Sequence, residues 1–107
     1  MINKLELEFN GTGEVSEFKF IQIKSNEYSK IYKVFNEFGD SWYEVFETKV
    51  VPLCLDFENR IYSETEFKEA YPKSRDFGIW AYTTKDANRA TAISFEIDNK
   101  KQKDDRT

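Results

Sequence analysis

The chain has no histidine, one cysteine, two prolines and four glycines in 107 residues. Without His, nucleophilic catalysis by Ser–His or Cys–His pairs and metal binding by imidazole are excluded. A single Cys excludes an internal disulfide and a multi-cysteine zinc site. No stretch approaches the ~20 apolar residues of a membrane-spanning helix, and the N-terminus lacks the basic start and apolar core of a signal peptide. We therefore expect a cytoplasmic protein that takes no cofactor and contacts no membrane.

Aromatic residues, by contrast, are abundant. Ten Phe, six Tyr and two Trp make up 17% of the chain, and a disordered chain would be poor in them. Hydrophobic residues contribute 39% and charged residues 34%, which is typical of a globular protein. The length predicts one domain over residues 1–98. Residues 99–107 contain no apolar side chain and are predicted to form a frayed polar tail.

The acidic residues are concentrated in the middle third of the chain. The net charge is −4, and residues 37–69 alone hold nine acidic and three basic residues. Such a block disfavours direct binding to nucleic acid, which requires cations against phosphate. It favours a basic protein partner, because complementary charge speeds encounter. The alternative is that these are ordinary solubilising surface charges.

The N-terminal third predicts a β-hairpin. Leu5, Leu7 and Phe9 alternate with polar residues, and residues 15–23 are apolar on both faces at their centre, as in an interior strand. The Asn10–Gly13 stretch between them predicts the turn. A phosphate-binding loop is the alternative, but the Gly-Lys-Ser/Thr ending is missing.

Two further strands are predicted at residues 28–36 and 42–47, joined by a turn that contains Gly39. Residues 50–55 form a short apolar run that Pro52 restricts to an edge or irregular segment. Ser63-x-x-Glu66 has the form of a capping box and predicts a short helix that ends at Ala70, before Pro72.

The last third predicts a strand and then a helix. Residues 77–82 form the strand, with Trp80 and Tyr82 on one side of it. A helix begins near Lys85 and extends to residue 92. For residues 93–97, helix and strand both remain open. The expected fold is α+β, a single antiparallel sheet of five to six strands with a C-terminal helix packed on one face.

Catalytic chemistry has little support in these residues. Asp56 and Glu58, together with Asp40 or Glu44, have the composition of a metal or carboxylate site, but in a chain with 20 acidic residues such pairs arise by chance. Cys54 lies between two leucines, where a buried and unreactive thiol is expected. We expect a protein that is not an enzyme and has no metal site.

Two candidate binding surfaces follow instead. Aromatic anchors with acidic neighbours are typical of protein interfaces. They predict a partner-binding surface made of Trp42, Glu44, Glu47, Asp56, Glu58, Trp80 and Tyr82. The alternative is an RNA-binding module, in which basic residues beside aromatic residues contact single-stranded RNA. Its candidate residues are Lys73, Arg75, Lys85 and Arg89.

Two segments carry a resemblance to a known group of proteins. They are Tyr43-Glu44-Val45-Phe46 and the stretch from Tyr71-Pro72-Lys73 to Phe77-Gly78-Ile79-Trp80-Ala81-Tyr82. Together they resemble small proteins of Bacteroidota phages and mobile elements, over about residues 42–49 and 71–92. This chain departs from that pattern by a longer acidic insert, residues 50–70. The group has no defined activity, so no catalytic residue carries over.

The resemblance implies an accessory protein of a phage. Small acidic proteins of that kind look like anti-CRISPR proteins, which inhibit a host defence nuclease by binding it. On this reading the partner is a basic bacterial protein, a CRISPR effector nuclease or its ribonucleoprotein. The oligomeric state and the inhibited step remain open.

Overall fold

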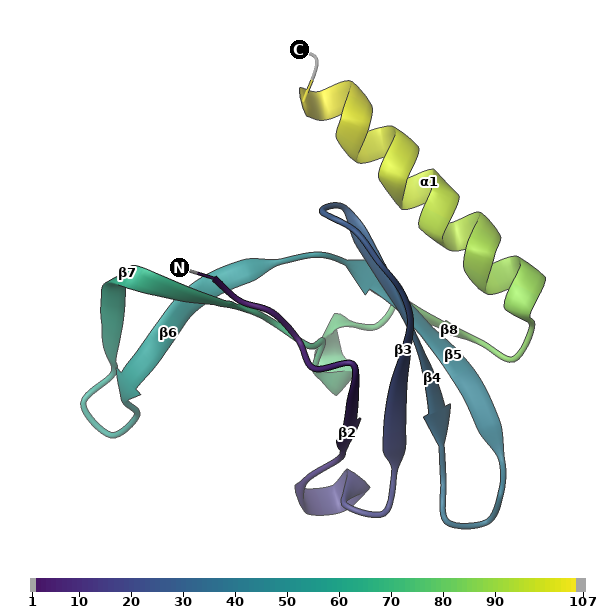
Figure 1. Cartoon of the computed structure of the whole chain (residues 1–107), viewed down its shortest axis with the longest axis horizontal. Helices are drawn as coiled ribbons and strands as arrows, with labels where there is room; N and C mark the ends of the chain where they lie inside the picture. The colour runs from purple at the N-terminus through teal and green to yellow at the C-terminus, as the bar shows by residue number, and fades with distance from the viewer. Residues whose placement is uncertain (1, 106–107) are drawn as a thin grey trace.

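The computed structural model describes residues 2–105, and within them the fold is α+β, with two sheets and one long helix (Figure 1). The larger sheet is antiparallel, in the order β2-β3-β4-β5-β8. Its strands are β2 (Glu8–Asn10), β3 (Lys19–Ser25), β4 (Ser29–Phe35), β5 (Ser41–Glu47) and β8 (Ala81–Thr84). The predicted class, a five-stranded antiparallel sheet and a C-terminal helix packed on it, is confirmed.

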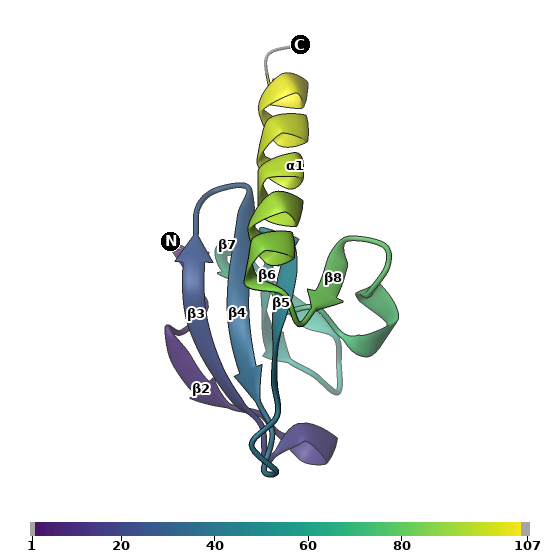
Figure 2. The same cartoon turned by 90° about the vertical axis from the view of Figure 1, so that its right-hand side faces the viewer.

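Helix α1 (Ala87–Asp105) crosses one face of this sheet (Figure 2). Side chains alternate between the two faces of a strand, so neighbouring residues of β4 and β5 enter different cores. Ile31 and Val45 pack against Ala90 and Ile93 of α1. Tyr32, Val34 and Phe46 point to the other face.

That other face carries an aromatic core. Phe20, Tyr32 and Phe46 are buried there, and Phe9, Phe18, Trp42, Tyr71, Phe77 and Trp80 pack around them. The ring of Tyr71 is central, with centroids 5.6 Å from Phe9, 5.3 Å from both Phe20 and Tyr32, and 4.8 Å from Phe46. Much of the aromatic surplus is therefore core.

A second sheet departs from the predicted single one. Its order is β1-β7-β6, with β1 (Ile2–Asn3) parallel to β7 (Ile61–Glu69) and β6 (Val50–Asp56) antiparallel to it. Figure 1 shows this sheet extending away from the larger one. We call residues 2–3 and 50–69 the arm.

The predicted helix over residues 63–70 is wrong, because these residues belong to β7. The Ser63 hydroxyl does accept hydrogen bonds from the N–H groups of Thr65 (3.2 Å) and Glu66 (2.8 Å), as a helix cap would. At these bonds the register between β7 and β6 shifts. Tyr62 pairs with Cys54, and the next paired residue of β7 is Phe67, opposite Pro52. The capping signal therefore produces a bulge, because strand pairing on both sides prevents helix propagation.

The C-terminal predictions need two corrections, and the structure decides one alternative that was left open. The predicted strand over residues 77–82 begins at Ala81, because Gly78, with φ +92°, and the bond from its N–H to Ala81 O (2.6 Å) form a turn before it. Residues 93–97, for which helix and strand were both open, are helical. Helix α1 continues to Asp105, so residues 99–105 are helix and not a frayed tail, and residues 106–107 of the predicted tail lie outside the described residues. The propensity of Lys and Gln for helix supports this extension.

A buried ion pair joins the arm to the larger sheet. Lys30 Nζ of β4 lies 3.0 Å from Glu69 Oε2 at the end of β7, with side-chain exposures of 1% and 9%. The other Glu69 oxygen accepts the N–H of Leu5 at 2.9 Å, and Lys30 also donates to Ser25 Oγ. The pair therefore connects the sheet, the arm and the N-terminal segment.

A polar network joins α1 to the sheet. Asp98 accepts hydrogen bonds from Ser29 Oγ (2.7 Å), Lys24 Nζ (3.1 Å) and Asn26 Nδ2 (3.2 Å), and Ser94 Oγ lies 2.7 Å from Ser29 Oγ. Burial acts to raise the pKa of Asp98, but the bonds from these three residues outweigh it and the pKa is lowered. The ionised carboxylate is thus the form that the fold stabilises.

The ion pair leads to a first prediction. Lys30→Met leaves the Glu69 carboxylate buried without its cation, and we expect it to lower the free energy of unfolding by about 3–5 kcal/mol. Lys19→Met is the control, because it breaks the exposed Lys19–Glu8 pair, worth about 1 kcal/mol or less. Urea unfolding followed by circular dichroism measures both. Equal effects of the two substitutions would show that the pair does not hold the arm.

The Asp98 network leads to a second prediction. Because the folded-state pKa is lowered, its contribution to stability is present above the ordinary Asp pKa of about 3.9 and is lost as pH falls through the folded value. We expect Asp98→Asn to lower Tm strongly at neutral pH and progressively less below about pH 4. Thermal unfolding across pH measures this, with Glu96→Gln, an exposed carboxylate on the same helix, as control. A Tm difference that is independent of pH would contradict it.

Candidate interaction surface

The arm has exposed apolar residues and no core of its own. Neither hydrophobic core cluster of the described residues includes a buried residue from it. Its exposed large apolar side chains are Ile2, Val50, Leu55, Phe57, Ile61 and Tyr62. Four of them, Leu55, Phe57, Ile61 and Tyr62, lie in or beside the turn between β6 and β7, and an exposed apolar patch on a small domain marks an interaction site. The arm is therefore the first candidate surface.

The turn between β6 and β7 is internally braced. Asp56 Oδ1 accepts the N–H groups of Glu58 (3.1 Å) and Asn59 (3.3 Å), while Asn59 Nδ2 donates to Asp56 Oδ2 at 2.8 Å. The bonds from Asn59, first its side chain and then its backbone, lower the pKa of Asp56. Asp56 thus shapes the turn, whereas Glu58 is exposed on it.

Trp42 and Glu44 lie elsewhere, on β5 of the larger sheet. Glu44 accepts Trp42 Nε1 at 3.0 Å and the Tyr71 hydroxyl at 2.6 Å. Burial, and then the nearby Glu44 carboxylate, raise the pKa of Tyr71, so its hydroxyl keeps the proton that it donates. Both oxygens of Glu44 are therefore engaged inside the fold, and Trp42 packs on Phe18.

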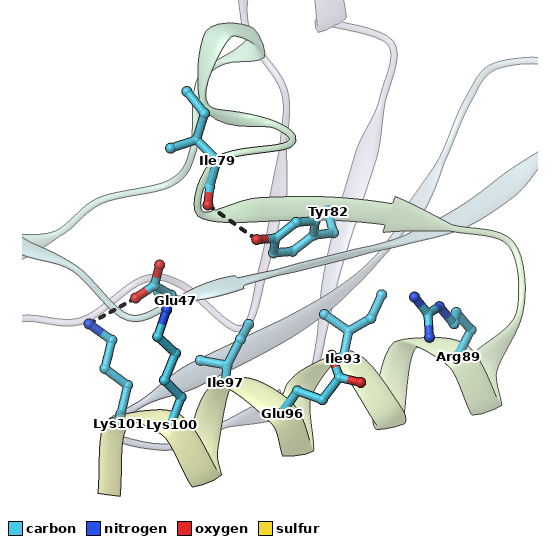
Figure 3. A pocket seen from close by; sticks show the side chains of 9 residues that line it. All are labelled: Glu47, Ile79, Tyr82, Arg89, Ile93, Glu96, Ile97, Lys100 and Lys101. Atoms are coloured by element: carbon cyan, nitrogen blue, oxygen red, sulfur yellow. Dashed lines mark hydrogen bonds and ion pairs between the residues drawn. The ribbon is translucent and has the colours of Figure 1, made fainter. Parts of the chain in front are cut away.

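A groove between α1 and β8 brings together Glu47, Tyr82 and Arg89 (Figure 3). It has a volume of about 290 Å³ and an apolar floor that includes Ile93 and Ile97. Lys101 Nζ lies 2.8 Å from Glu47 Oε1, and the Tyr82 hydroxyl donates to Ile79 O at 3.1 Å. Two predicted partner-binding residues and one predicted RNA-binding residue thus share one groove.

Trp80 does not share a side with Tyr82, contrary to the sequence prediction. It precedes β8 and packs edge-to-face on Phe46 in the aromatic core, 6.2 Å between ring centroids, with Lys49 Nζ 4.8 Å from its ring centroid. The seven predicted partner-binding residues therefore fall in three places, the arm turn, the β5 core face and the α1 groove.

The four predicted RNA-binding residues are also divided. Lys73 and Arg75, at the 3₁₀ turn η2 (Ser74–Asp76), line a cleft with the arm turn. Arg89 lines the α1 groove, and Lys85 lies in a shallow hollow beside Trp42. Sequence proximity to Trp80 did not make one platform, because the chain reverses at Gly78 and again after Thr84.

The structure does not bring together the residues of the alternative carboxylate or metal site. Within residues 2–105, no group of three His, Cys, Asp or Glu side chains is arranged to hold a metal ion. Asp56 and Glu58 lie on the arm, while Glu44 is bonded inside the larger sheet. Cys54 is a half-buried free thiol, more accessible than the buried thiol expected. In the same residues no helix has the length and apolar character of a membrane span.

Leu55, Phe57, Ile61 and Tyr62 are exposed and were not among the predicted surface residues. Pro52 was the available signal, since proline is confined to edge strands and bulges, and the structure adds two register shifts in β6. No protein-family model matches this chain, and comparison with curated proteins and with solved structures found no match.

The positions of Glu44 and Glu58 lead to a third prediction. Glu44→Lys leaves the Tyr71 hydroxyl and Trp42 Nε1 without their acceptor, and we expect it to cost about 1–3 kcal/mol of stability. Glu58→Lys is the matched control on the exposed turn and is expected to stay within about 0.5 kcal/mol of the unsubstituted chain. Urea unfolding measures both. If Glu44→Lys is as stable as Glu58→Lys, Glu44 is a surface residue and not part of the core face.

Proposed function

We propose that this chain is a non-enzymatic binding protein that docks a basic protein through the exposed apolar and acidic side chains of the arm. One observation carries the proposal: the arm exposes six large apolar side chains and packs on neither core. Its size, residues 2–3 and 50–69, is close to the ~20–30 residues that one partner contributes to an interface.

Charge supports a basic partner. Glu58 in the turn and Glu64 and Glu66 in β7 are exposed on the arm, which also exposes Leu55 and Ile61. Apolar anchors slow the dissociation of a complex, and the charges around them speed association and select the partner. The wider acidic block of residues 37–69 adds to the same field.

The specific activity that we propose is inhibition of a bacterial defence nuclease, in the manner of an anti-CRISPR protein. Nucleases that handle nucleic acid carry basic channels, and an acidic arm with apolar anchors is complementary to such a channel. The resemblance of residues 42–49 and 71–92 to proteins of Bacteroidota phages and mobile elements supports an accessory protein of a phage, the kind of protein that anti-CRISPR proteins are. The arm coincides with the acidic insert that distinguishes this chain from that group.

The test starts from affinity capture with the tagged chain in a lysate of its bacterial host, with and without added nuclease treatment. We expect a basic nuclease that is retained after treatment. The double variant Leu55→Ser/Ile61→Ser should weaken its binding at least about tenfold, since both side chains are exposed anchors. Glu64→Lys/Glu66→Lys should slow association and reduce its dependence on salt. Surface plasmon resonance measures both, and a cleavage assay measures inhibition.

Phe38→Ser is the matched control. Phe38 is 81% exposed in the turn between β4 and β5, outside the arm, so its loss should change neither binding nor inhibition. If Phe38→Ser weakens binding as much as the arm variants, the arm is not the docking surface. If capture disappears on nuclease treatment, the contact runs through nucleic acid and the proposed protein contact is wrong.

A further inference from the structure

Two clefts lie between the arm and the rest of the chain, and the proposed function does not use the cations that line them. The first has a volume of about 670 Å³ and separates the N-terminal segment from β6 and β7, with Lys4, Leu53 and Lys68 in its walls. The second, of about 600 Å³, is lined by Phe57, Glu58, Arg60, Tyr62, Lys73 and Arg75. Lys73 lines both, so the two clefts adjoin. Figure 1 shows the arm reaching past the N-terminal segment.

Cations predominate along these clefts. They are Lys4, Arg60, Lys68, Lys73 and Arg75. In the described part of the chain none of them is in an ion pair, since the pairs there involve other cations. The lining carboxylates are Glu6, Glu58 and Glu69, and Glu69 is already neutralised by Lys30.

The carboxylate of Asp76, the last residue of η2, is also engaged within the fold. It accepts the Lys73 N–H at 2.8 Å, and this bond is the main reason that the pKa of Asp76 is lowered. The charges of Lys73 and Arg75 contribute less to that pKa. The side chains of Lys73 and Arg75 are exposed and remain available to an anion.

Two aromatic rings face the same cations without a ring partner. Phe57 is 86% exposed and Tyr62 is 52% exposed, and neither takes part in a ring contact among the described residues. Exposed rings beside cations are the elements with which proteins hold single-stranded nucleic acid, by stacking bases and pairing phosphates.

Arg60 adds an independent observation, because it occupies a position that favours another residue. Its φ is +54°, in the left-handed region where Gly or Asn is preferred and where other residues cost of order 1 kcal/mol. Backbone strain of this kind collects at functional sites. The strained residue is an arginine that lines the cleft, and a guanidinium group can bind phosphate through two hydrogen bonds.

We propose that the adjoining clefts bind single-stranded nucleic acid, with bases stacked on Phe57 and Tyr62 and phosphates on Arg60, Lys73 and Arg75. Lys68 and Lys4 continue the phosphate path along the first cleft. Phe57 and Tyr62 also belong to the exposed apolar set of the arm, but Arg60, Lys73 and Arg75 do not, and none of the five is substituted in the test of the proposed function. The two proposals can therefore fail separately.

Fluorescence anisotropy of labelled oligonucleotides of about six nucleotides tests the site at low salt, with RNA and DNA probes of one sequence. We expect saturable binding that Phe57→Ala or Tyr62→Ala weakens about tenfold. Lys73→Ala should also reduce the slope of log affinity against log salt by about 0.7. Tighter binding of the RNA probe assigns the site to RNA, and equal binding assigns it to single strands in general.

Arg60→Gly is the sharpest variant, because it removes the cation and relieves the positive φ. We expect binding to weaken while Tm stays equal or rises. Lys85→Ala and Arg89→Ala, which remove cations outside the two clefts, are the controls and should leave binding unchanged.

Three results would overturn the proposal. The first is a flat titration with both probes. The second is weakening by the control substitutions equal to that by Arg60→Gly and Lys73→Ala. The third is binding that survives Phe57→Ala and Tyr62→Ala while inorganic polyphosphate or an acidic peptide competes as well as the oligonucleotide, since this would reveal a polyanion surface without base stacking.

Discussion

The buried pair of Lys30 and Glu69 is the constraint on which the arrangement of this molecule depends. An ammonium group in the centre of a sheet must be paired, because its desolvation is costly. The carboxylate that pairs with it ends β7, and its second oxygen holds the N–H of Leu5. Immediately after β7, Tyr71 enters the aromatic core and donates to Glu44. The base of the arm is thus held by charge and by aromatic packing.

This attachment explains why cations line the clefts beside the arm, although the arm belongs to the acidic part of the chain. Fixing Glu69 over β4 directs the arm away from the larger sheet, so its strand pair is covered by neither α1 nor the aromatic core. The acidic residues Glu64 and Glu66 stay outside the clefts, whereas Arg60 and Lys68 line them together with Lys4, Lys73 and Arg75. The strand pair of the arm therefore carries exposed acidic side chains at Glu64 and Glu66 and cations at Arg60 and Lys68, which line the clefts.

The parts of the fold that follow from local patterns were predictable. Alternation in residues 28–36 and 42–47 with a Gly39 turn corresponds to β4 and β5, whose register runs without interruption from Ser29↔Glu47 to Phe35↔Ser41. The presence of the C-terminal helix was predictable, but its extension to Asp105 was not predicted. Ser63 shows the opposite case: its capping bonds form, but pairing with β6 decides that the segment is a strand. Trp80 and Tyr82 were assigned to one side because a period of two assumes an unbroken strand, and the Gly78 turn breaks it.

The sequence by itself excluded histidine-dependent and disulfide chemistry, and it determined the strands that show a local alternation of apolar and polar residues. The lack of His, the lone Cys54 and the alternation of apolar residues need no knowledge of the fold, because each is a property of composition or of neighbouring residues. Only the tertiary structure decided which distant side chains meet. Lys30 and Glu69, or Arg60 and Lys73, are brought together by strand pairing and by the direction of the arm, and no local period records such a contact.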